Sequence, residues 1–341
     1  MQPNHHPFEF HGKAGEFFKI WIVNILLSII TLGIYSAWAK VRTRRYFYNN
    51  TYLMNAPFDY LADPIKILKG RLLVLAFVIV YVAIAALFPE AEAVLILLFI
   101  PVFPWVIIKA LKFNWYNSAY RNIRFHFSAD YLKALWVFIG LPILIAFTFG
   151  LAYPYFVKAR KQFVIDNSAY GTSRFEMTAS IGQFYAVYGK ALLIVLAALL
   201  TVAGFSYALW QGIGLTNGSI NPALPAILLL LLYPFLMLVY GYVYAHITNL
   251  SINHTFLPQI HFESRLETGK ICWLYITNAL AIIVSLGLLI PWARIRMARY
   301  RIACLSLSSS TDLDRFVAAE AEQAEAIGEE IGDFLDIDIG L

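Results

Sequence analysis

The chain has 341 residues, of which 60% are hydrophobic and only 14% are charged, and its mean hydropathy is +0.66. Soluble domains carry about 25% charged residues, so this composition excludes a soluble globular protein and predicts a multi-pass membrane protein. The formal net charge of +5 hides an asymmetry, because residues 312–341 contain ten acidic side chains against Arg315 alone. Two cysteines are too few for a disulfide framework or a thiolate metal site. Residues 1–12 lack the layout of a removable signal peptide, so we expect the first apolar run to stay in the mature protein.

Seven apolar runs are long enough to cross a hydrocarbon core of about 30 Å, which takes about 20 helical residues. They group as one segment, which we call an anchor, followed by a two-span hairpin, twice, and then a third anchor. The sequence therefore predicts a mainly α-helical, polytopic membrane protein with about seven membrane segments. The runs are residues 18–37, 72–88, 93–110, 132–154, 191–210, 223–244 and 271–292.

Each anchor ends in an aromatic residue followed by Lys or Arg at alternate positions, in the stretches 33–46, 152–163 and 287–300. Aromatic rings at headgroup depth and cations in the anionic surface layer are typical of the point where a chain leaves a membrane. We therefore expect these residues at the membrane interface, in contact with lipid headgroups. They are Trp38, Lys40, Arg42, Arg44, Arg45, Lys158, Arg160, Lys161, Trp292, Arg294, Arg296 and Arg299.

The similarity of the three anchor ends predicts a threefold internal repeat. The first and third copies match without a gap at an offset of 254, and the second copy follows the first at an offset of 118. The chain then divides into repeat 1 (1–130), repeat 2 (131–262), a partial repeat 3 (263–311), and an acidic tail (312–341) that we expect to be partly helical, then disordered, and solvated.

Short stretches in which apolar and polar residues alternate lie before the anchors and after them. Period-two alternation indicates β-strands, with loops as the alternative. An open sheet edge cannot stand in hydrocarbon, so we expect the strands to form a small sheet or barrel outside the membrane. The candidates are residues 8–11, 123–127 and 259–263 before the anchors, and 51–60, 169–178 and 302–308 after them.

Basic residues follow all three anchors, which creates a conflict if every apolar run crosses the membrane. Seven simple crossings would place residues 158–190 on the opposite side from residues 38–71, against the positive-inside rule. If each anchor enters and leaves on the cytoplasmic face, all basic stretches share one side. Inverted repeats with ordinary spans, as in many transporters, are the alternative.

Three motifs carry a resemblance to a known family: WAKVRTRRY at residues 38–46, NNTYLMNAPFDY at 49–60 and SLGLLIPWARIR at 285–296. Together they resemble the YjgN family of bacterial inner-membrane proteins, over roughly residues 8–310. The resemblance implies a multi-pass protein of the bacterial inner membrane whose activity is not established. It implies no catalytic or binding residue.

The sequence contains no motif of an established catalytic, phosphate-binding or Cys-based metal site, so we predict no catalytic residue, no metal site and no cofactor. A metal site made from the histidines is the less favoured alternative to interfacial hydrogen bonding. Basic residues next to apolar runs favour anionic lipid headgroups over nucleic acid as partner.

Polar side chains inside the anchors need partners at bilayer depth. Interhelical hydrogen bonds are one interpretation, and a polar path for a solute is the other. Acidic residues are absent from the interior of the seven runs, which disfavours proton- or sodium-coupled transport. The polar positions are Asn24, Ser28, Thr31, Thr148, Asn278 and Ser285.

Two hypotheses of function follow. The repeat and the polar positions favour a transporter or channel for a small or amphipathic solute. The basic anchor ends favour a non-transporting membrane scaffold or envelope-homeostasis factor that binds anionic lipid. An enzyme ranks third, because no nucleophile, base or metal centre can be assembled from the sequence.

Overall fold

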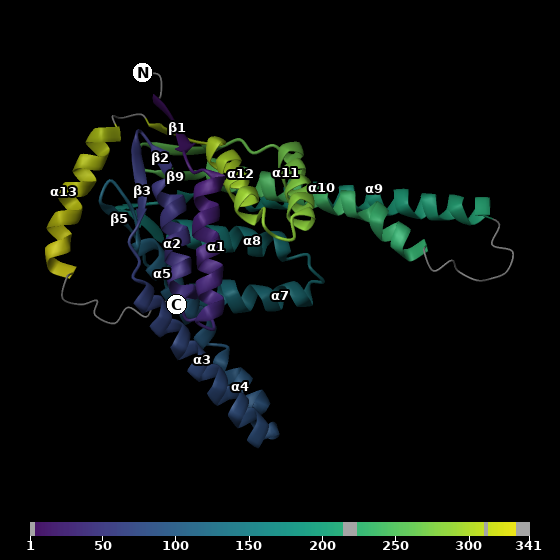
Figure 1. Cartoon of the computed structure of the whole chain (residues 1–341), viewed down its shortest axis with the longest axis horizontal. Coiled ribbons are helices and arrows are strands. Elements are labelled where there is room, and N and C mark those ends of the chain that lie inside the picture. The colour runs from purple at the N-terminus through teal and green to yellow at the C-terminus, as the bar shows by residue number, and fades with distance from the viewer. Residues whose placement is uncertain (1–3, 214–223, 310–312, 332–341) are drawn as a thin grey trace.

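The computed structural model describes residues 4–213, 224–309 and 313–331 (Figure 1). Most of these residues are helical, and the strands form one sheet. Figure 1 shows long helices that extend from the body of the molecule, with α13 (Leu313–Ile331) on the other side of the sheet from their tips. The predicted fold class, a mainly α-helical protein with a small sheet or barrel, is confirmed to this extent.

The sheet has eleven strands in the order β7-β6-β5-β4-β3-β2-β1-β11-β10-β9-β8, and all paired neighbours are antiparallel. The two end strands, β7 and β8, are separated in the chain only by Phe175, so the sheet nearly closes on itself as a barrel. The strands are β1 (Asn4–Phe10), β2 (Thr51–Leu53), β3 (Ala56–Tyr60), β4 (Ser118–Tyr120), β5 (Ile123–Phe127), β6 (Ser168–Tyr170), β7 (Ser173–Arg174), β8 (Glu176–Met177), β9 (Thr255–Leu257), β10 (Ile260–Ser264) and β11 (Leu305–Ser309).

The strands predicted before the anchors are confirmed as β1, β5 and β10, and those predicted after the first two anchors as β2, β3 and β6 to β8. The third predicted segment after an anchor, 302–308, is only partly a strand, because the preceding helix continues to Ala303.

Tight turns and helical segments alternate as connections between consecutive strands. In the turns, Met54 and Asn55 have φ angles of 47° and 59°, and Arg121 and Asn122 have 48° and 67°. Two adjacent residues with positive φ fit the twist of an antiparallel hairpin. Because neighbouring strands are antiparallel, all tight turns lie at one rim of the barrel, which we call the turn rim. All helical segments that connect two strands leave from the opposite rim, the helix rim.

The three anchors are short helical hairpins, not single spans. Each helix is followed by a turn with the same two backbone angles: φ is 48° and 90° at Leu32 and Gly33, 49° and 89° at Phe149 and Gly150, and 50° and 92° at Leu286 and Gly287. The chain then returns to the helix rim. The hairpins are α1 (Ala14–Ile30) with α2 (Ser36–Asn49); α6 (Tyr131–Leu135), η2 (Trp136–Gly140) and α7 (Leu141–Phe147) with α8 (Tyr153–Asp166); and α11 (Thr268–Val284) with α12 (Ile290–Ala303).

Seven membrane segments are therefore not confirmed: four helices of the described residues are long and apolar enough to cross a membrane, and the anchors turn back as short hairpins. The first anchor helix has 17 residues, which at 1.5 Å per residue reach only about 25 Å. Apolar length alone does not reveal that the chain turns back inside the run. The threefold repeat stays an interpretation of the sequence.

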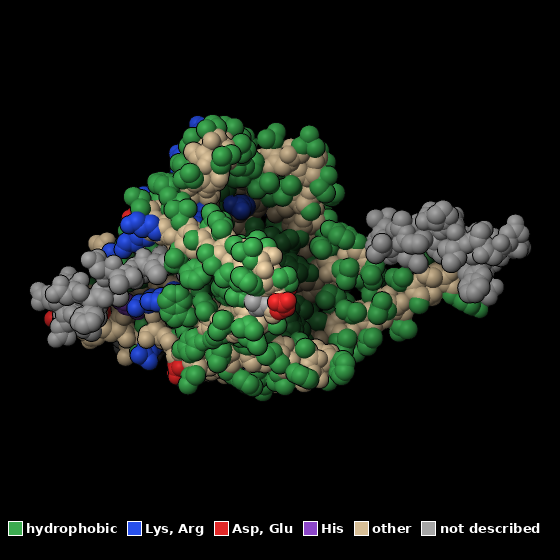
Figure 2. Space-filling model, turned by 90° about the horizontal axis from the view of Figure 1, so that it is seen from below, with side chains coloured by type: hydrophobic (Ala, Val, Ile, Leu, Met, Phe, Trp, Pro, Cys, Tyr) green, Lys and Arg blue, Asp and Glu red, His purple; other side chains and the backbone are tan. Residues whose placement is uncertain are grey.

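The four candidate spans belong to two long hairpins. Their side chains are largely exposed and apolar, as expected of a surface that contacts lipid (Figure 2). The predicted tip at residues 211–222 lies mostly outside the described residues. The first hairpin comprises α3 (Pro64–Leu87), η1 (Pro89–Ala91), α4 (Glu92–Phe99) and α5 (Val102–Tyr116), and the second comprises α9 (Ile181–Ile213) and α10 (Leu224–Asn253).

Because every helical connection between strands starts and ends at the helix rim, we predict that the whole barrel lies on one side of the membrane and the tip of the first long hairpin on the other. Glu9 in β1, Arg174 in β7 and Glu90 at the hairpin tip are exposed. In a protein with Cys272 and Cys304 replaced by Ser, a Glu90→Cys variant should react with an impermeant thiol reagent added outside intact cells. Glu9→Cys and Arg174→Cys should react only after permeabilisation. External labelling of Arg174→Cys alone would contradict a barrel confined to one side.

Candidate ligand-binding cavity

The interior of the barrel is lined by phenylalanine side chains. Phe8, Phe58, Phe125, Phe175 and Phe262 surround a cavity of about 140 Å³ that has a wholly apolar lining. Ring centroids lie 6.1 Å apart for Phe8 and Phe58, 6.4 Å for Phe125 and Phe175, and 5.9 Å for Phe175 and Phe262. Side chains alternate along a strand, and Phe8 and Phe125 lie on the face of their strands that lines this cavity. We call this space the lumen.

Two tyrosines of the lumen confirm how strongly it is desolvated. The hydroxyl of Tyr120 donates to the carbonyl of Leu53 at 2.7 Å, and the hydroxyl of Tyr170 donates to the carbonyl of Tyr120 at 3.2 Å. Burial raises the pKa of both hydroxyls above the usual value, since a phenolate could not be hydrated there. The lumen therefore suits an apolar guest.

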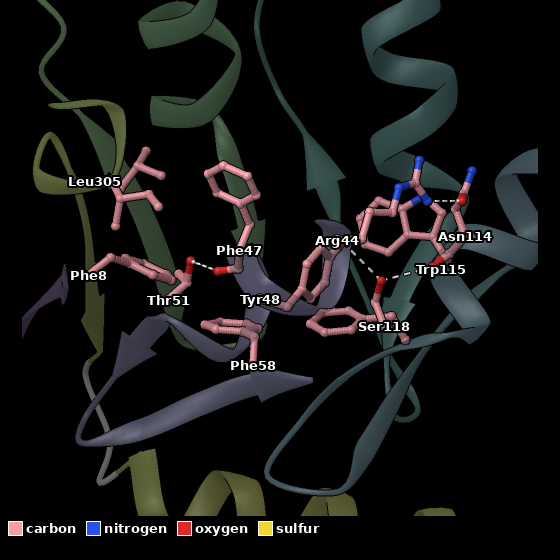
Figure 3. A pocket seen from close by; sticks show the side chains of 12 residues that line it. Phe8, Arg44, Phe47, Tyr48, Thr51, Phe58, Asn114, Trp115, Ser118 and Leu305 are labelled. Carbon is pink, nitrogen blue, oxygen red and sulfur yellow. Dashed lines mark hydrogen bonds between the residues drawn. The ribbon is translucent and has the colours of Figure 1, made fainter. Parts of the chain in front are cut away.

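A larger cavity of about 540 Å³ lies at the helix rim and forms the mouth of the lumen (Figure 3). Three of the phenylalanines that line the lumen also line the mouth, so the two spaces lie next to each other. Figure 3 shows Arg44 and Asn114 at one end of the mouth and Phe8 at the other. Arg44 donates to the Tyr60 hydroxyl at 2.9 Å and to Asn114 Oδ1, and lies 5.3 Å from the centroid of the Tyr60 ring.

A third cavity, of about 630 Å³, lies between α1, α2 and α12, and we call it the vestibule. Arg44 lines both the vestibule and the mouth, which places the two next to each other. Lys40 and Arg294 also line the vestibule, and none of the described residues in its wall is acidic. Burial lowers the pKa of Lys40, and the charges of Arg44 and Arg71 lower it further. The apolar part of the wall consists of Ala39 and of Trp21, Ile25 and Ile29 of α1.

Helix α13 covers the lumen at the turn rim. Leu313, Phe316 and Val317 line the lumen, and the ring of Phe316 stacks on Tyr170 at 6.4 Å. The expectation that the acidic tail is a solvated appendix is thus wrong for its first turns. The helix also reaches Ile331, and the residues beyond it lie outside the described part of the chain.

A buried acid fixes α13 in this place. Glu320 is only 5% exposed. Its carboxylate accepts hydrogen bonds from the backbone amide of Thr172 at 2.6 Å, the hydroxyl of Thr172 at 3.0 Å and the hydroxyl of Ser173 at 2.5 Å. These groups belong to the turn between β6 and β7, so one carboxylate ties the tail to the barrel.

Most of the predicted interface residues outside the vestibule contact neighbouring protein groups. Trp38 stacks on Tyr35, Arg42 is exposed and Lys161 is half-buried, with its pKa lowered by burial and by Arg160 and Arg301. The other contacts are those of Arg45 with the carbonyl of Tyr60, Lys158 with Gln162, Arg160 with the ring of Phe156, Arg296 with the ring of Trp292, and Arg299 with the carbonyl of Gly12.

The predicted polar positions divide into two groups. Thr31, Thr148 and Ser285 accept hydrogen bonds from the backbone amide four residues later, at 2.9, 3.1 and 3.0 Å, and so stabilise the turns of the short hairpins. Asn24 and Ser28 line the vestibule. Asn278 is described below. The structure thus brings only part of the predicted polar path to a cavity.

Sequence reasoning missed the lumen phenylalanines as a binding surface, and it missed Glu320. The alternating motifs indicated strands but not which face would be enclosed. Glu320 belongs to a run of acids in which burial leaves no mark on the sequence. Arg44 was predicted to contact lipid headgroups, whereas the structure places it at the junction of two cavities.

The fold and cavities define a polytopic membrane protein with a strand barrel next to its membrane helices. The chain belongs to a family described as "Bacterial protein of unknown function (DUF898)", which it matches over residues 5–334. It is 36% identical over 146 residues to "Inner membrane protein YjgN" of Salmonella typhimurium, and 35% identical over 154 residues to the protein of the same name in Escherichia coli K12. These alignments cover 42% and 43% of this chain but only 36% and 37% of the relatives. No significant match was found among solved structures.

We predict that replacing Glu320 loosens α13. Hydrogen bonds to a charged group contribute about 1.5–3 kcal/mol, so Glu320→Ala should make a C-terminal tag at least tenfold more sensitive to trypsin, which can cut after Arg315. Glu322 is exposed and provides the matched control, so Glu322→Ala should leave the rate of tag loss unchanged. Equal rates for both variants would show that the carboxylate does not hold the helix.

Proposed function

We propose that this protein binds an amphipathic ligand with an apolar chain, which enters the barrel from the bilayer through the mouth, and that it carries or transports this ligand. The observation that supports the proposal is an apolar lumen beside a larger cavity at the helix rim, where both long hairpins of membrane helices begin and end. The mouth alone, at about 540 Å³, falls within the range of about 300–1,000 Å³ of typical ligand pockets.

The location agrees with this proposal. The chain is a bacterial inner-membrane protein, as its family, the names of its relatives and its four apolar helices indicate. Apolar molecules are concentrated in the bilayer, and a cavity that opens beside the membrane helices can take them up without passage through water. The vestibule next to the mouth supplies cations for a polar headgroup.

A non-transporting scaffold on lipid is the second candidate, and the tips of the short hairpins favour it. Leu32 is 94% exposed, Phe149 98% and Leu286 93%. Large apolar side chains with such exposure are typical of a membrane contact. The three hairpins would then dip into one leaflet and hold the barrel against it, which is compatible with ligand uptake from that leaflet.

We predict that lipid can be trapped inside the barrel. A photo-reactive benzoylphenylalanine at Phe125, which lines the lumen, should form lipid adducts in native membranes that mass spectrometry detects. The neighbouring residue His126 is exposed on the outer face of the same strand and is the matched control. Adducts should be at least tenfold more abundant at position 125.

Equal yields at the two positions would mean that lipid only surrounds the barrel, and this would contradict the proposal. A complete lack of adducts at position 125, in a protein that elutes as one monodisperse peak, would contradict it as well. A carrier role further requires that vesicles containing the protein exchange a fluorescent fatty acid faster than vesicles without it.

A further inference from the structure

The vestibule has the chemistry of an anion site. Lys40, Arg44 and Arg294 come from two different hairpins and converge on one cavity without an acidic residue among the described lining. Cations brought together in a partly desolvated space repel one another, and each favours an anion that enters. Figure 2 shows a basic side chain inside a hollow of a face that is otherwise largely hydrophobic.

A second observation concerns Asn24, which also lines the vestibule and is only 6% exposed. Its Nδ2 donates to the carbonyl of Ala39 and to the hydroxyl of Thr43, both at 3.4 Å, but its Oδ1 has no hydrogen-bond partner among the described residues. A buried acceptor without a partner costs about 1–3 kcal/mol. The vestibule therefore contains one acceptor that lacks a donor.

In the third anchor, the asparagine at the equivalent position accepts a hydrogen bond from another side chain of the protein. Asn278 is the counterpart of Asn24, and its Nδ2 donates to the carbonyl of Ala293 at the same 3.4 Å. Its Oδ1 accepts a hydrogen bond from Arg296 at 3.1 Å. Arg42, the counterpart of Arg296, is exposed instead. The Oδ1 atom of this asparagine therefore lacks a hydrogen-bond donor in the first anchor but not in the third, and Asn24 lines the vestibule.

We propose that the vestibule binds the headgroup of an anionic phospholipid that carries a hydroxyl, such as phosphatidylglycerol. In this site Lys40, Arg44 and Arg294 bind the phosphodiester, the headgroup hydroxyl donates to Asn24 Oδ1, and an acyl chain passes Arg44 into the mouth. The three cations disfavour an ammonium headgroup, so a hydroxyl is the donor that fits. The inference rests on the proposed function, because it names the class of the ligand whose chain the barrel takes up.

The test is native mass spectrometry of the purified full chain with three lipids that have identical acyl chains. Phosphatidylglycerol has the charge and the hydroxyl, phosphatidylmethanol has the charge alone, and phosphatidylcholine has no net charge. The wild type should bind phosphatidylglycerol best and phosphatidylcholine worst. Soluble glycerol phosphate in excess should not displace phosphatidylglycerol.

Two variants separate the charge from the hydroxyl. Lys40→Gln should weaken both anionic lipids equally, by about fivefold, since one cation near an anionic group contributes about 1 kcal/mol. Lys158→Gln is the matched control, because Lys158 occupies the corresponding position of the second anchor and bonds to Gln162. Asn24→Leu should remove only the preference for phosphatidylglycerol over phosphatidylmethanol. Unchanged binding of phosphatidylmethanol shows that this variant is folded.

Several outcomes would overturn the inference: no preference of the wild type for anionic lipid, equal effects of Lys40→Gln and Lys158→Gln, or an Asn24→Leu variant that still prefers phosphatidylglycerol over phosphatidylmethanol. Displacement by glycerol phosphate would assign the vestibule to a soluble phosphate ester instead. If adducts still form at position 125 without any headgroup preference, only this inference fails. If the preference persists without adducts, the proposed uptake into the barrel fails.

Discussion

The antiparallel pairing of the strands is the constraint on which the rest of the structure depends. Each strand must place its backbone groups against two neighbours, and the chain meets this demand by nearly closing the sheet on itself. Once the pairing is antiparallel, the connections fall alternately at the two rims. The tight turns occupy one rim, so every helical segment that connects two strands has both ends at the other. The membrane helices and the basic anchor ends thus share one side of the barrel, where α2 also packs against α3 and α10 against α11.

The short hairpins solve a second problem, which is how an apolar helix returns before it has crossed a bilayer. A residue pair with positive φ, such as Leu32 and Gly33, reverses the chain, and the side chain of Thr31 accepts a backbone amide that the turn leaves without a helical partner. Glycine is required at a φ of 90°, where other residues are strained. The apolar residue before it, Leu32 in the first hairpin, is exposed, and such a side chain would gain from contact with hydrocarbon.

Much of the fold could be predicted from the sequence, but its membrane crossings could not. The alternation of apolar and polar residues in the short motifs predicted the strands. The basic residues at the anchor ends predicted that the three anchors end on one side. Only four of the seven apolar segments are helices long enough to cross a membrane, because a hydropathy profile gives the length of an apolar run but not the point at which the chain turns back. The sequence does contain a motif that distinguishes the short hairpins. It consists of Ser or Thr, then an apolar residue, then Gly, at residues 31–33, 148–150 and 285–287. The cavities could not be predicted, because which face of the strands is enclosed depends on closure of the sheet, and Arg44 and Arg294 meet only when the first and third anchors pack together.

The character of the cavity changes along its length in a way that favours an amphipathic guest over a hydrophilic solute. The vestibule is cationic, the mouth has one Arg among aromatic rings, and the lumen is apolar throughout. A hydrophilic solute would lose its hydration in the lumen without gaining hydrogen bonds, whereas an acyl chain gains about 0.8 kcal/mol for each methylene group that it buries. Helix α13 covers the turn rim and is held by the buried Glu320. Passage through the barrel would have to break these charged hydrogen bonds and expose apolar side chains together. With α13 in place, the proposed ligand would therefore have to enter and leave the barrel at the helix rim.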